Sequence, residues 1–340
     1  MPTPSVWDID ENRLAPDAPA EARARFALNY AVLAPSSHNA QPWRFIADGK
    51  TIILCADRTR ALPVIDPFDR ELVISCGAAL FNLRVALSHF ALGYAITLFP
   101  AVADPDVLAI VRVLPDGARD THAASLFDAI RKRVTTREAF RAEAIAPEDQ
   151  DRLLLAADAE GAEAVCMDEL HRREQIGNLV AEADGIQFRD PRFRRELASW
   201  IHSRRAADGM PAYAPDVNKL LDFAVPLTAS IIRTFDLGGG LAAAHKSLAY
   251  GSPVLLCIGT ATDDREAWLV AGQALERVLL TGVQLGLTAS YLNQPIEVES
   301  LRNALAQVTG MSAYPQLLLR MGCGPRAGHS PRRALSDVVS

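Results

Sequence analysis

Residues 34–45 read APSSHNAQPWRF, and the organisation of the chain is clearest when it is followed outward from this stretch. Pro35 and Pro42 enclose side chains that donate or accept hydrogen bonds, and each proline restricts its own φ and disfavours helix at the residue before it. Helical apolar spacing precedes the stretch, and an extended apolar pattern that includes Phe45 follows it. The stretch is therefore a rigid polar loop between a helix and a strand, which suits either a flat hydrogen-bonding ligand or an ordinary turn.

Around this polar loop, periodicity predicts the elements of one α+β unit. The most distinctive element is a long helix over residues 70–92, which is apolar on most sides and therefore belongs at the centre of its domain. Gly93 provides its end. A shorter helix and three strands complete the unit, at residues 21–33, 51–56, 95–99 and 108–114.

The later part of the chain contains a second set of elements and one irregular insertion. We expect helices at residues 147–157, 171–188, 191–206 and 265–285, and strands at residues 163–167, 253–260 and 316–321. Residues 208–241 contain several prolines and aromatic side chains and the run Gly238–Gly240. Long irregular insertions in compact domains are commonly lids or binding loops, so we expect a lid here, and a basic, loop-like tail after the last strand.

The two parts of the chain resemble each other, which suggests an internal duplication. In each part, a long apolar helix is followed by a short extended run and a proline, and an ungapped alignment places Gly77 opposite Gly272 and Pro100 opposite Pro295. The polar loop occurs only in the first part, whereas the segment RVTTR, residues 133–137, occurs only at the start of the second. A ligand site that uses both segments would be assembled from both halves, once per chain.

Composition excludes several classes of function. The chain has 340 residues and a net charge of −6, which disfavours a nucleic-acid partner, and its clustered basic residues suit a small anion better. We expect no signal sequence and no membrane partner, because no segment approaches the ~20 uninterrupted apolar residues of a membrane span. The five cysteines form no C-x-x-C pair, so we expect reduced thiols in the cytoplasm and no metal site.

The polar loop resembles the ring-binding loop of the nitroreductase family of flavoproteins, in which a P-S-S-x-N-x-Q-P-W run lies against the isoalloxazine ring of FMN. From about Arg25 onward, the chain is similar to the Acg-like FMN-binding branch, in which two nitroreductase-like halves are fused in tandem. The resemblance implies an α+β, nitroreductase-like fold in which each half has an antiparallel or mixed sheet packed on long central apolar helices, as a pseudo-dimer. Its implied divisions are an N-terminal arm at 1–20, a first half at 21–125, and a second half at 126–340 with the lid-like insertion at 208–241.

The resemblance also implies a phosphate site for FMN. Arg133, Thr135 and Arg137 match the family's Arg-x-Ser-x-Arg phosphate motif, with threonine in the serine position. Arg332 and Arg333 stand where the family has a C-terminal basic pair. Pro331 aligns better with the first cation of that pair, so the assignment rests mainly on Arg333. A phosphomonoester carries nearly two negative charges at neutral pH and is bound best by guanidinium and hydroxyl groups. The alternatives are a solvated cationic face for the first segment and a disordered basic tail for the second.

For the flavin ring, the resemblance implies two further groups of residues. The ring-side residues of the polar loop are Ser36, Ser37, His38, Asn39 and Gln41. Among them, Asn39 and Gln41 offer amide groups that either face the ring or hold the loop itself. The residues expected to present backbone N–H groups to flavin N5 and O4 are Leu292, Asn293 and Gln294, for which a plain helix-to-strand turn is the alternative.

The function implied is that of an FMN-dependent oxidoreductase in which NADH or NADPH supplies electrons for a nitroaromatic, a quinone or a similar small acceptor. The cofactor carries this chemistry, so no catalytic side chain is required. One alternative is an FMN-sequestering or storage protein whose lid covers the flavin and prevents turnover. A serine hydrolase is disfavoured because no G-x-S-x-G motif is present. The fused halves are compatible with a monomeric pseudo-dimer or a homodimer.

Overall fold

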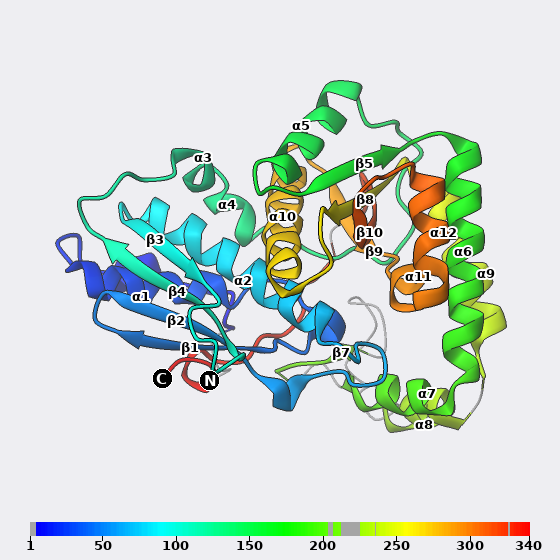
Figure 1. The fold of residues 1–340 in the computed structure, drawn as a ribbon, viewed down its shortest axis with the longest axis horizontal. Helices are drawn as coiled ribbons and strands as arrows, with labels where there is room; N and C mark the ends of the chain where they lie inside the picture. The colour runs from blue at the N-terminus through cyan, green and yellow to red at the C-terminus, as the bar shows by residue number, and fades with distance from the viewer. Residues whose placement is uncertain (1–4, 203–206, 212–224, 235, 326) are drawn as a thin grey trace.

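The computed structural model describes residues 5–202, 207–211, 225–234, 236–325 and 327–340. The described chain is an α+β fold with a four-stranded sheet in its early part and another in its later part (Figure 1). The long helices α2 (Arg70–His89) and α10 (Arg265–Gln284) meet between the two parts. The prediction of an α+β protein with two halves is therefore confirmed.

The first half is built around α2, whose residues are almost all buried. Its other main elements are α1 (Ala20–Ala31), β1 (Trp43–Asp48), β2 (Thr51–Ala56), β3 (Gly93–Leu98) and β4 (Val107–Leu114). The short helices α3 (Thr121–Ala124) and α4 (Phe127–Ile130) lead to the second half. Helix α2 begins where the sequence predicts but ends before Leu92, because Ala91 adopts a left-handed conformation with φ of 59°.

The second half is built around α10 and carries more helices. The helices are α5 (Pro147–Asp158), α6 (Leu170–Arg189), α7 (Pro191–Ser199), α8 (Val225–Thr234), α9 (Gly238–Gly251), α11 (Gln294–Glu297) and α12 (Glu299–Thr309). The strands are β5 (Glu163–Met167), β6 (Ile201–His202), β7 (Met210–Pro211), β8 (Val254–Thr260), β9 (Thr288–Tyr291) and β10 (Tyr314–Gly322). Strand β5 has its predicted bounds.

The two four-stranded sheets have the same topology. The first has the order β1-β2-β4-β3 and the second β5-β8-β10-β9, and neighbouring strands are antiparallel in both. In each sheet the long apolar helix connects the second strand of the order to the fourth. The halves differ between the first and second strands, which are joined by a tight turn at Gly49 in the first half and by α6 to α9 in the second.

Helices α2 and α10 approach closely because each has a glycine at their contact. A Cβ atom at Gly77 would lie 3.0 Å from the Cα of Gly272, and one at Gly272 would overlap the carbonyl oxygen of Ile74. Only a residue without a side chain permits this approach. The two glycines that the ungapped alignment pairs are therefore in contact at the centre of the molecule. Helix α2 is long and apolar enough to cross a membrane, but 89% of its apolar window is buried inside the protein, as in a core helix.

Both ends of the described chain pack beside the first sheet (Figure 1). The C-terminal residues run along β1, where the Phe45 amide donates to the Val338 carbonyl at 2.7 Å and the Ser340 amide donates to the Phe45 carbonyl at 3.0 Å. The Trp7 indole donates to the carbonyl of Ser330 at 2.9 Å. The tail is therefore docked on the first half rather than being a solvated loop, and it carries residues of the second half across to the polar loop.

Two predictions of secondary structure differ from the fold. The helix expected at 191–206 ends at Ser199, and β6 follows it and pairs with β7 in parallel. The expected lid at 208–241 lies partly outside the described residues, at 212–224 and 235, so it is described only in part. Its described part is more regular than expected, because it includes β7, α8 and the first residues of α9.

Candidate functional site

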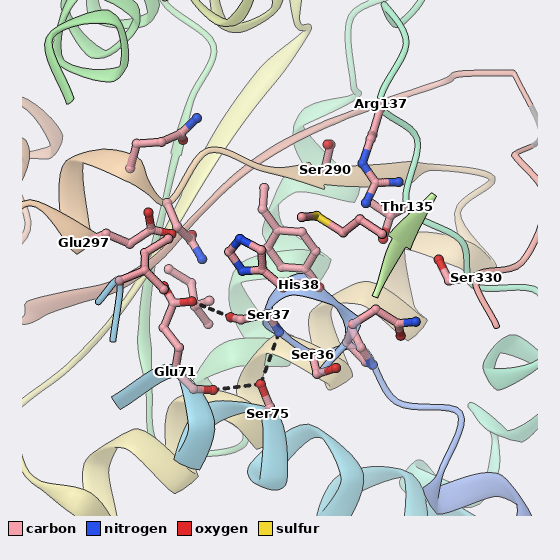
Figure 2. A pocket seen from close by; sticks show the side chains of 18 of the residues that line it. Ser36, Ser37, His38, Glu71, Ser75, Thr135, Arg137, Ser290, Glu297 and Ser330 are labelled. Atoms are coloured by element: carbon pink, nitrogen blue, oxygen red, sulfur yellow. Dashed lines mark hydrogen bonds between the residues drawn. The ribbon is translucent and has the colours of Figure 1, made fainter. Parts of the chain in front are cut away.

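A cavity of about 350 Å³ lies between the two halves. The polar loop and α2 contribute from the first half, and Trp7 contributes from the N-terminal arm. The second half contributes the segment 133–137, the residues after β9 and the C-terminal tail. It also contributes α6 to α9, the region between β5 and β8 that includes residues 208–241 and is called the insertion from here on. This volume falls in the range of small-molecule sites. Figure 2 shows the cavity with His38 near its centre, Arg137 and Thr135 to one side, and Glu71 and Glu297 to the other.

The polar loop reaches the cavity in a strained conformation. His38, Asn39 and Gln41 have φ values of 51°, 53° and 54°, in the left-handed region that non-glycine residues rarely occupy. Each such residue costs about 1–3 kcal/mol and persists only where its surroundings hold it. The backbone N–H group of Gln41 donates to the Ser36 hydroxyl at 2.9 Å, which closes the loop on itself.

The amide side chains of the polar loop hold the loop in place. The Asn39 side chain donates to the carbonyls of Gly209 and Pro331, both at 3.1 Å, and accepts from Arg332 at 2.8 Å. The Gln41 side chain donates to the carbonyl of Ala207 at 2.9 Å and accepts from the Arg333 amide at 2.9 Å. The sequence left open whether these amides face a ligand or hold the loop. Their hydrogen bonds fix the loop to the insertion and to the tail.

The segment 133–137 forms the cationic end of the cavity. It runs beside β9, where Thr135 forms a bridge with Ala289, so the alternate residues Arg133, Thr135 and Arg137 all line the cavity. Arg320, 1% exposed, secures the segment by donating to the carbonyl of Thr136 at 2.9 Å.

Arg137 is the free cation of this end. Residue Arg137 is exposed, and across the described residues it makes no hydrogen bond or ion pair. Partial desolvation beside the cavity lowers its pKa. A guanidinium that lines a cavity next to a threonine hydroxyl, and that has no partner among the described residues, is suited to an anion that enters the cavity.

Arg133 and Arg332 form a buried cluster with a carboxyl group behind the cationic end. Arg133 Nε lies 3.6 Å from a carboxyl oxygen of Glu276, which is fully buried on α10. Burial raises the pKa of Glu276 to about 7, against the opposing effect of Arg133. Arg332 donates to the carbonyls of Leu33 and Ala34, at 3.1 and 2.9 Å, and burial together with Arg133 lowers its pKa to about 9. The cluster therefore holds excess positive charge that an incoming anion would offset.

The opposite end of the cavity is acidic. Ser37 donates its hydroxyl proton to the Glu71 carboxylate, and Arg70 pairs with the same carboxylate at 3.1 Å. Glu297 accepts from the Gln187 side chain at 2.6 Å. Burial, and then the nearby Glu71 charge, raise the pKa of Glu297 well above its usual value, so Glu297 favours its protonated form.

His38 lies between the two ends. Its ring lines the cavity, and burial lowers its pKa to about 4, which outweighs the opposite effect of Glu71. The imidazole is therefore neutral at neutral pH and can either donate or accept one hydrogen bond.

Two other polar atoms face the cavity without a partner. The Tyr291 hydroxyl and the Gln294 side-chain oxygen are buried and make no hydrogen bond with any described residue. A buried polar atom that remains unpaired costs about 1–3 kcal/mol, so such atoms mark positions where a ligand group can bind. Together with Arg137, they fit a ligand that has both an anionic group and polar ring edges.

Not all of the predicted site residues line the cavity. Those that do are Ser36, Ser37, His38, Asn39, Arg133, Thr135, Arg137, Asn293, Gln294 and Arg332. Gln41, Leu292 and Arg333 lie behind the walls. The Leu292 N–H group donates to the Leu318 carbonyl at 2.8 Å, and the Arg333 side chain turns toward Asp57 and the carbonyl of Asp337. The cavity thus gathers most of the set and leaves these three in supporting positions.

Several cavity residues were not singled out from the sequence. They are Trp7, Glu71, Ser75, Asp184, His245 and Glu297. Ser75 carried one weak signal, because it interrupts the apolar run of α2, whereas Glu71 stands in the first turn, where acidic residues are common. Nothing in the local sequence distinguished the others.

The fold and the cavity define a two-lobed α+β protein with a deep small-molecule site between its lobes. No family model matches the chain. It is 33% identical over 327 residues to Rv3131 of Mycobacterium tuberculosis, a protein named as an NAD(P)H nitroreductase, with 94% of this chain and 92% of the relative covered. It is 28% identical over 330 residues to Acg of the same organism, also named as an NAD(P)H nitroreductase, with 92% and 93% covered. The chain belongs to the Acg-like branch of the nitroreductase family.

Solved structures include one similar protein described as the FMN and NADPH-dependent nitroreductase NfnB from Sphigopyxis sp. strain HMH. It shares 17% identity with this chain at a TM-score of 0.42, covering 63% of this chain and 97% of its own.

Proposed function

We propose that the protein is an FMN-dependent oxidoreductase that takes electrons from NADH or NADPH and reduces a small acceptor such as a nitroaromatic or a quinone. The observation that carries the proposal is Arg137, which lines a cavity of cofactor size beside Thr135 and pairs with no described residue. Membership of a family whose named relatives include NAD(P)H nitroreductases supports the same function.

In this proposal the FMN phosphate binds at the cationic end and the flavin ring lies beside the polar loop. Arg133, Thr135 and Arg137 hold the phosphate, and Arg332 contributes charge from behind the loop. Ser36, Ser37 and His38 face the ring, and Asn293 and Gln294 meet its polar edge. When bound, the flavin supplies hydride transfer, and the chain supplies its placement and the charges around it.

Arg137→Ala tests the phosphate assignment without disturbing the buried cluster. Loss of one charge-assisted partner, worth about 1.5–3 kcal/mol, should weaken FMN binding by about 10- to 100-fold, as measured by fluorescence titration. Arg131→Ala is the matched control, because Arg131 is exposed and does not line the cavity. An unchanged dissociation constant for Arg137→Ala would remove the phosphate from this end.

The redox assignment is tested by mixing the FMN-loaded protein with NADH or NADPH under anaerobic conditions. We expect the visible absorbance of the flavin to fall after mixing with at least one of the two donors, because the reduced flavin absorbs less than the oxidised one. If neither donor bleaches the flavin, the turnover function is wrong.

A second candidate, FMN storage, is favoured by one observation. The insertion contributes Met210 and Leu241 to the cavity wall, and Asn39 and Gln41 tie the polar loop to the carbonyls of Gly209 and Ala207. An insertion held this firmly over the flavin would exclude a nicotinamide. The same anaerobic mixing distinguishes the functions, because storage requires that neither donor reduces the flavin.

The remaining assignments follow from this function. The partner is a small-molecule electron acceptor, and the proposed organisation is an arm at 1–20, halves at 21–125 and 126–340, and one FMN site per chain. Cytoplasmic location and a monomeric or homodimeric state complete the proposal, and light scattering of the purified protein decides between the two states.

A further inference from the structure

The insertion gives the cavity an apolar wall that contains an imidazole–carboxylate pair. The apolar side chains that line this wall are Phe188, Phe193, Leu197, Met210 and Leu241. Asp184 of α6 and His245 of α9 also line the cavity on this side. The first half has no counterpart of these helices, because β1 and β2 are joined there by a tight turn.

The geometry of the pair orients the imidazole. His245 Nδ1 lies 2.8 Å from Asp184 Oδ2, and Gln294 Nε2 lies 3.2 Å from both Asp184 Oδ1 and His245 Nδ1. The carboxylate contact is the shorter of the two at Nδ1, and a carboxylate can only accept. Asp184 is 1% exposed, so its carboxylate depends on these donors. The carboxylate therefore keeps the proton of His245 on Nδ1 and leaves Nε2 as the reactive nitrogen.

Close packing of α6 against α9 keeps the pair together. A Cβ atom at Gly238 would lie 3.0 Å from the Cβ of Phe188, and one at Gly177 would lie 3.4 Å from the Lys246 side chain. These glycines let α9 lie directly on α6. The position of His245 is thus set by helix packing and not by a surface loop.

We propose that His245 donates the proton that completes reduction of the acceptor, and that the wall beside it binds an aromatic acceptor through a quinone or nitro oxygen. This inference rests on the proposed oxidoreductase function. A quinone that receives a hydride forms a hydroquinone anion. The imidazolium form of His245, which carries a proton on each ring nitrogen, gives its Nε2 proton to complete the hydroquinone and becomes the neutral Nδ1–H tautomer. A nitro group that receives a hydride and one proton becomes a nitroso group and releases water. In both cases His245 is left neutral and regains its proton from solvent.

The other acidic groups of the cavity are less suited to this task. Glu71 and Glu297 are engaged by Ser37 and Gln187. His38 has a pKa of about 4 as a result of burial, so it carries almost no proton to give at neutral pH. His245 Nε2 has no hydrogen-bond partner among the described residues, and its side chain is 31% exposed, which allows exchange with water.

The kinetic test uses FMN-loaded protein reduced with dithionite and mixed anaerobically with 1,4-naphthoquinone or with ferricyanide. His245→Gln should slow the quinone reaction by about 100-fold or more, the usual range of a general acid. The reaction of the reduced His245→Gln variant with ferricyanide should be as fast as that of the unmodified protein, because ferricyanide accepts electrons without a proton. His171→Gln is the matched control, since His171 is exposed on α6 and does not line the cavity.

A second readout does not depend on turnover. In ¹⁵N-histidine-labelled protein, the His245 resonances, assigned with the His245→Gln variant, should show the Nδ1–H tautomer when the ring is neutral. Asp184→Asn should shift this resonance pattern. A neutral Nε2–H tautomer in the unmodified protein would show that Asp184 does not orient the ring.

The outcomes separate this inference from the function on which it rests. A protein that does not bind FMN overturns both. An FMN-loaded His245→Gln variant that reduces naphthoquinone as fast as the unmodified protein overturns only the proton-donor role. Equal slowing of the quinone and ferricyanide reactions also overturns that role, because it indicates damage to the site and not loss of a proton donor.

Discussion

At the scale of single residues, the polar loop combines strain with many compensating hydrogen bonds. His38, Asn39 and Gln41 all occupy the left-handed region, yet Asn39 and Gln41 bind the insertion and the tail through nearly all of their side-chain polar atoms. His38 differs because its ring lines the cavity and makes no side-chain hydrogen bond with the described residues. The conformation is therefore held by its two amide neighbours, and His38 is the residue presented to a ligand.

The low pKa of His38 predicts a pH-dependent stability. Because burial lowers its pKa from 6.5 to about 4, the unfolded chain binds a proton more readily than the folded one between these values. Protonation of His38 in the unfolded chain should therefore lower the free energy of unfolding by about 2 kcal/mol as the pH falls from about 7 to about 5. The His38→Asn variant should lose less stability than the unmodified protein over this interval, as measured by urea unfolding.

The control for this comparison is His171→Asn, whose histidine is exposed. The control should follow the unmodified protein at both pH values. Parallel losses of stability in all three proteins would show that His38 is not the titrating group.

At the scale of elements, the contact of α2 with α10 sets the distance between the halves. Gly77 and Gly272 allow the two backbones to touch, and the remainder of both helices is packed with apolar side chains. Glu276, one turn after Gly272, is thereby buried against Arg133. The helix crossing thus positions the charged cluster that lies behind the cationic end of the cavity.

Gly272→Ala should strongly destabilise the protein. Its Cβ would overlap the carbonyl oxygen of Ile74, and backbone cannot move aside as a flexible side chain can. We expect a loss of about 3 kcal/mol or more in unfolding free energy, measured by urea unfolding. Gly240→Ala, on α9 with no atom within 4 Å of the added Cβ, is the control and should be neutral or stabilising by up to about 1 kcal/mol. Similar stabilities for both variants would mean that α2 and α10 are farther apart than the structure shows.

At the scale of the whole molecule, the cavity exists because segments distant in sequence meet. The C-terminal tail returns from the second half, lies along β1, and places His329, Ser330 and Arg332 in the cavity wall. Trp7 stacks on His329 with ring centroids 3.9 Å apart, so both ends of the chain close the same site.

Deleting residues 335–340 should destabilise the protein and weaken the site. The deletion removes the Val338 side chain, which is 2% exposed, and the hydrogen bonds of the tail to Phe45. Burial of one valine is worth about 1.5–3 kcal/mol, so the melting temperature should fall by several degrees. FMN affinity should also fall, because the residues after Arg332 would no longer be held on β1 by their hydrogen bonds to Phe45.

Ser336→Ala is the matched control for the deletion, since Ser336 is exposed and, within the part of the chain that the structure describes, its hydroxyl bonds to Asp337 alone. It should leave both the melting temperature and the FMN affinity unchanged. A truncated protein with the melting temperature of the full chain would show that the tail is not docked in solution.

The sequence alone determined the features that depend on local patterns. Hydrophobic periodicity placed the strands at 51–56 and 163–167 and the start of α2, since alternation and helical spacing act over a few residues. The two prolines marked the polar loop, and the matched glycines marked the helix contact. The alternation of Arg133, Thr135 and Arg137 indicated that these side chains could converge on one anion, and the resemblance to the family's phosphate motif favoured this over a solvated cationic face.

Only the tertiary structure decided which side chains share the cavity. Asp184 and His245, or Glu71 and Glu297, are far apart in the chain and meet only because α6 packs on α9 and α11 packs near α2. The same packing excluded residues that the motif included, because Leu292 gives its N–H group to β10 and Arg333 turns to Asp57. A local pattern sets what a residue can do, whereas its partners are set by the relative placement of distant elements, which depends on the packing of the entire core.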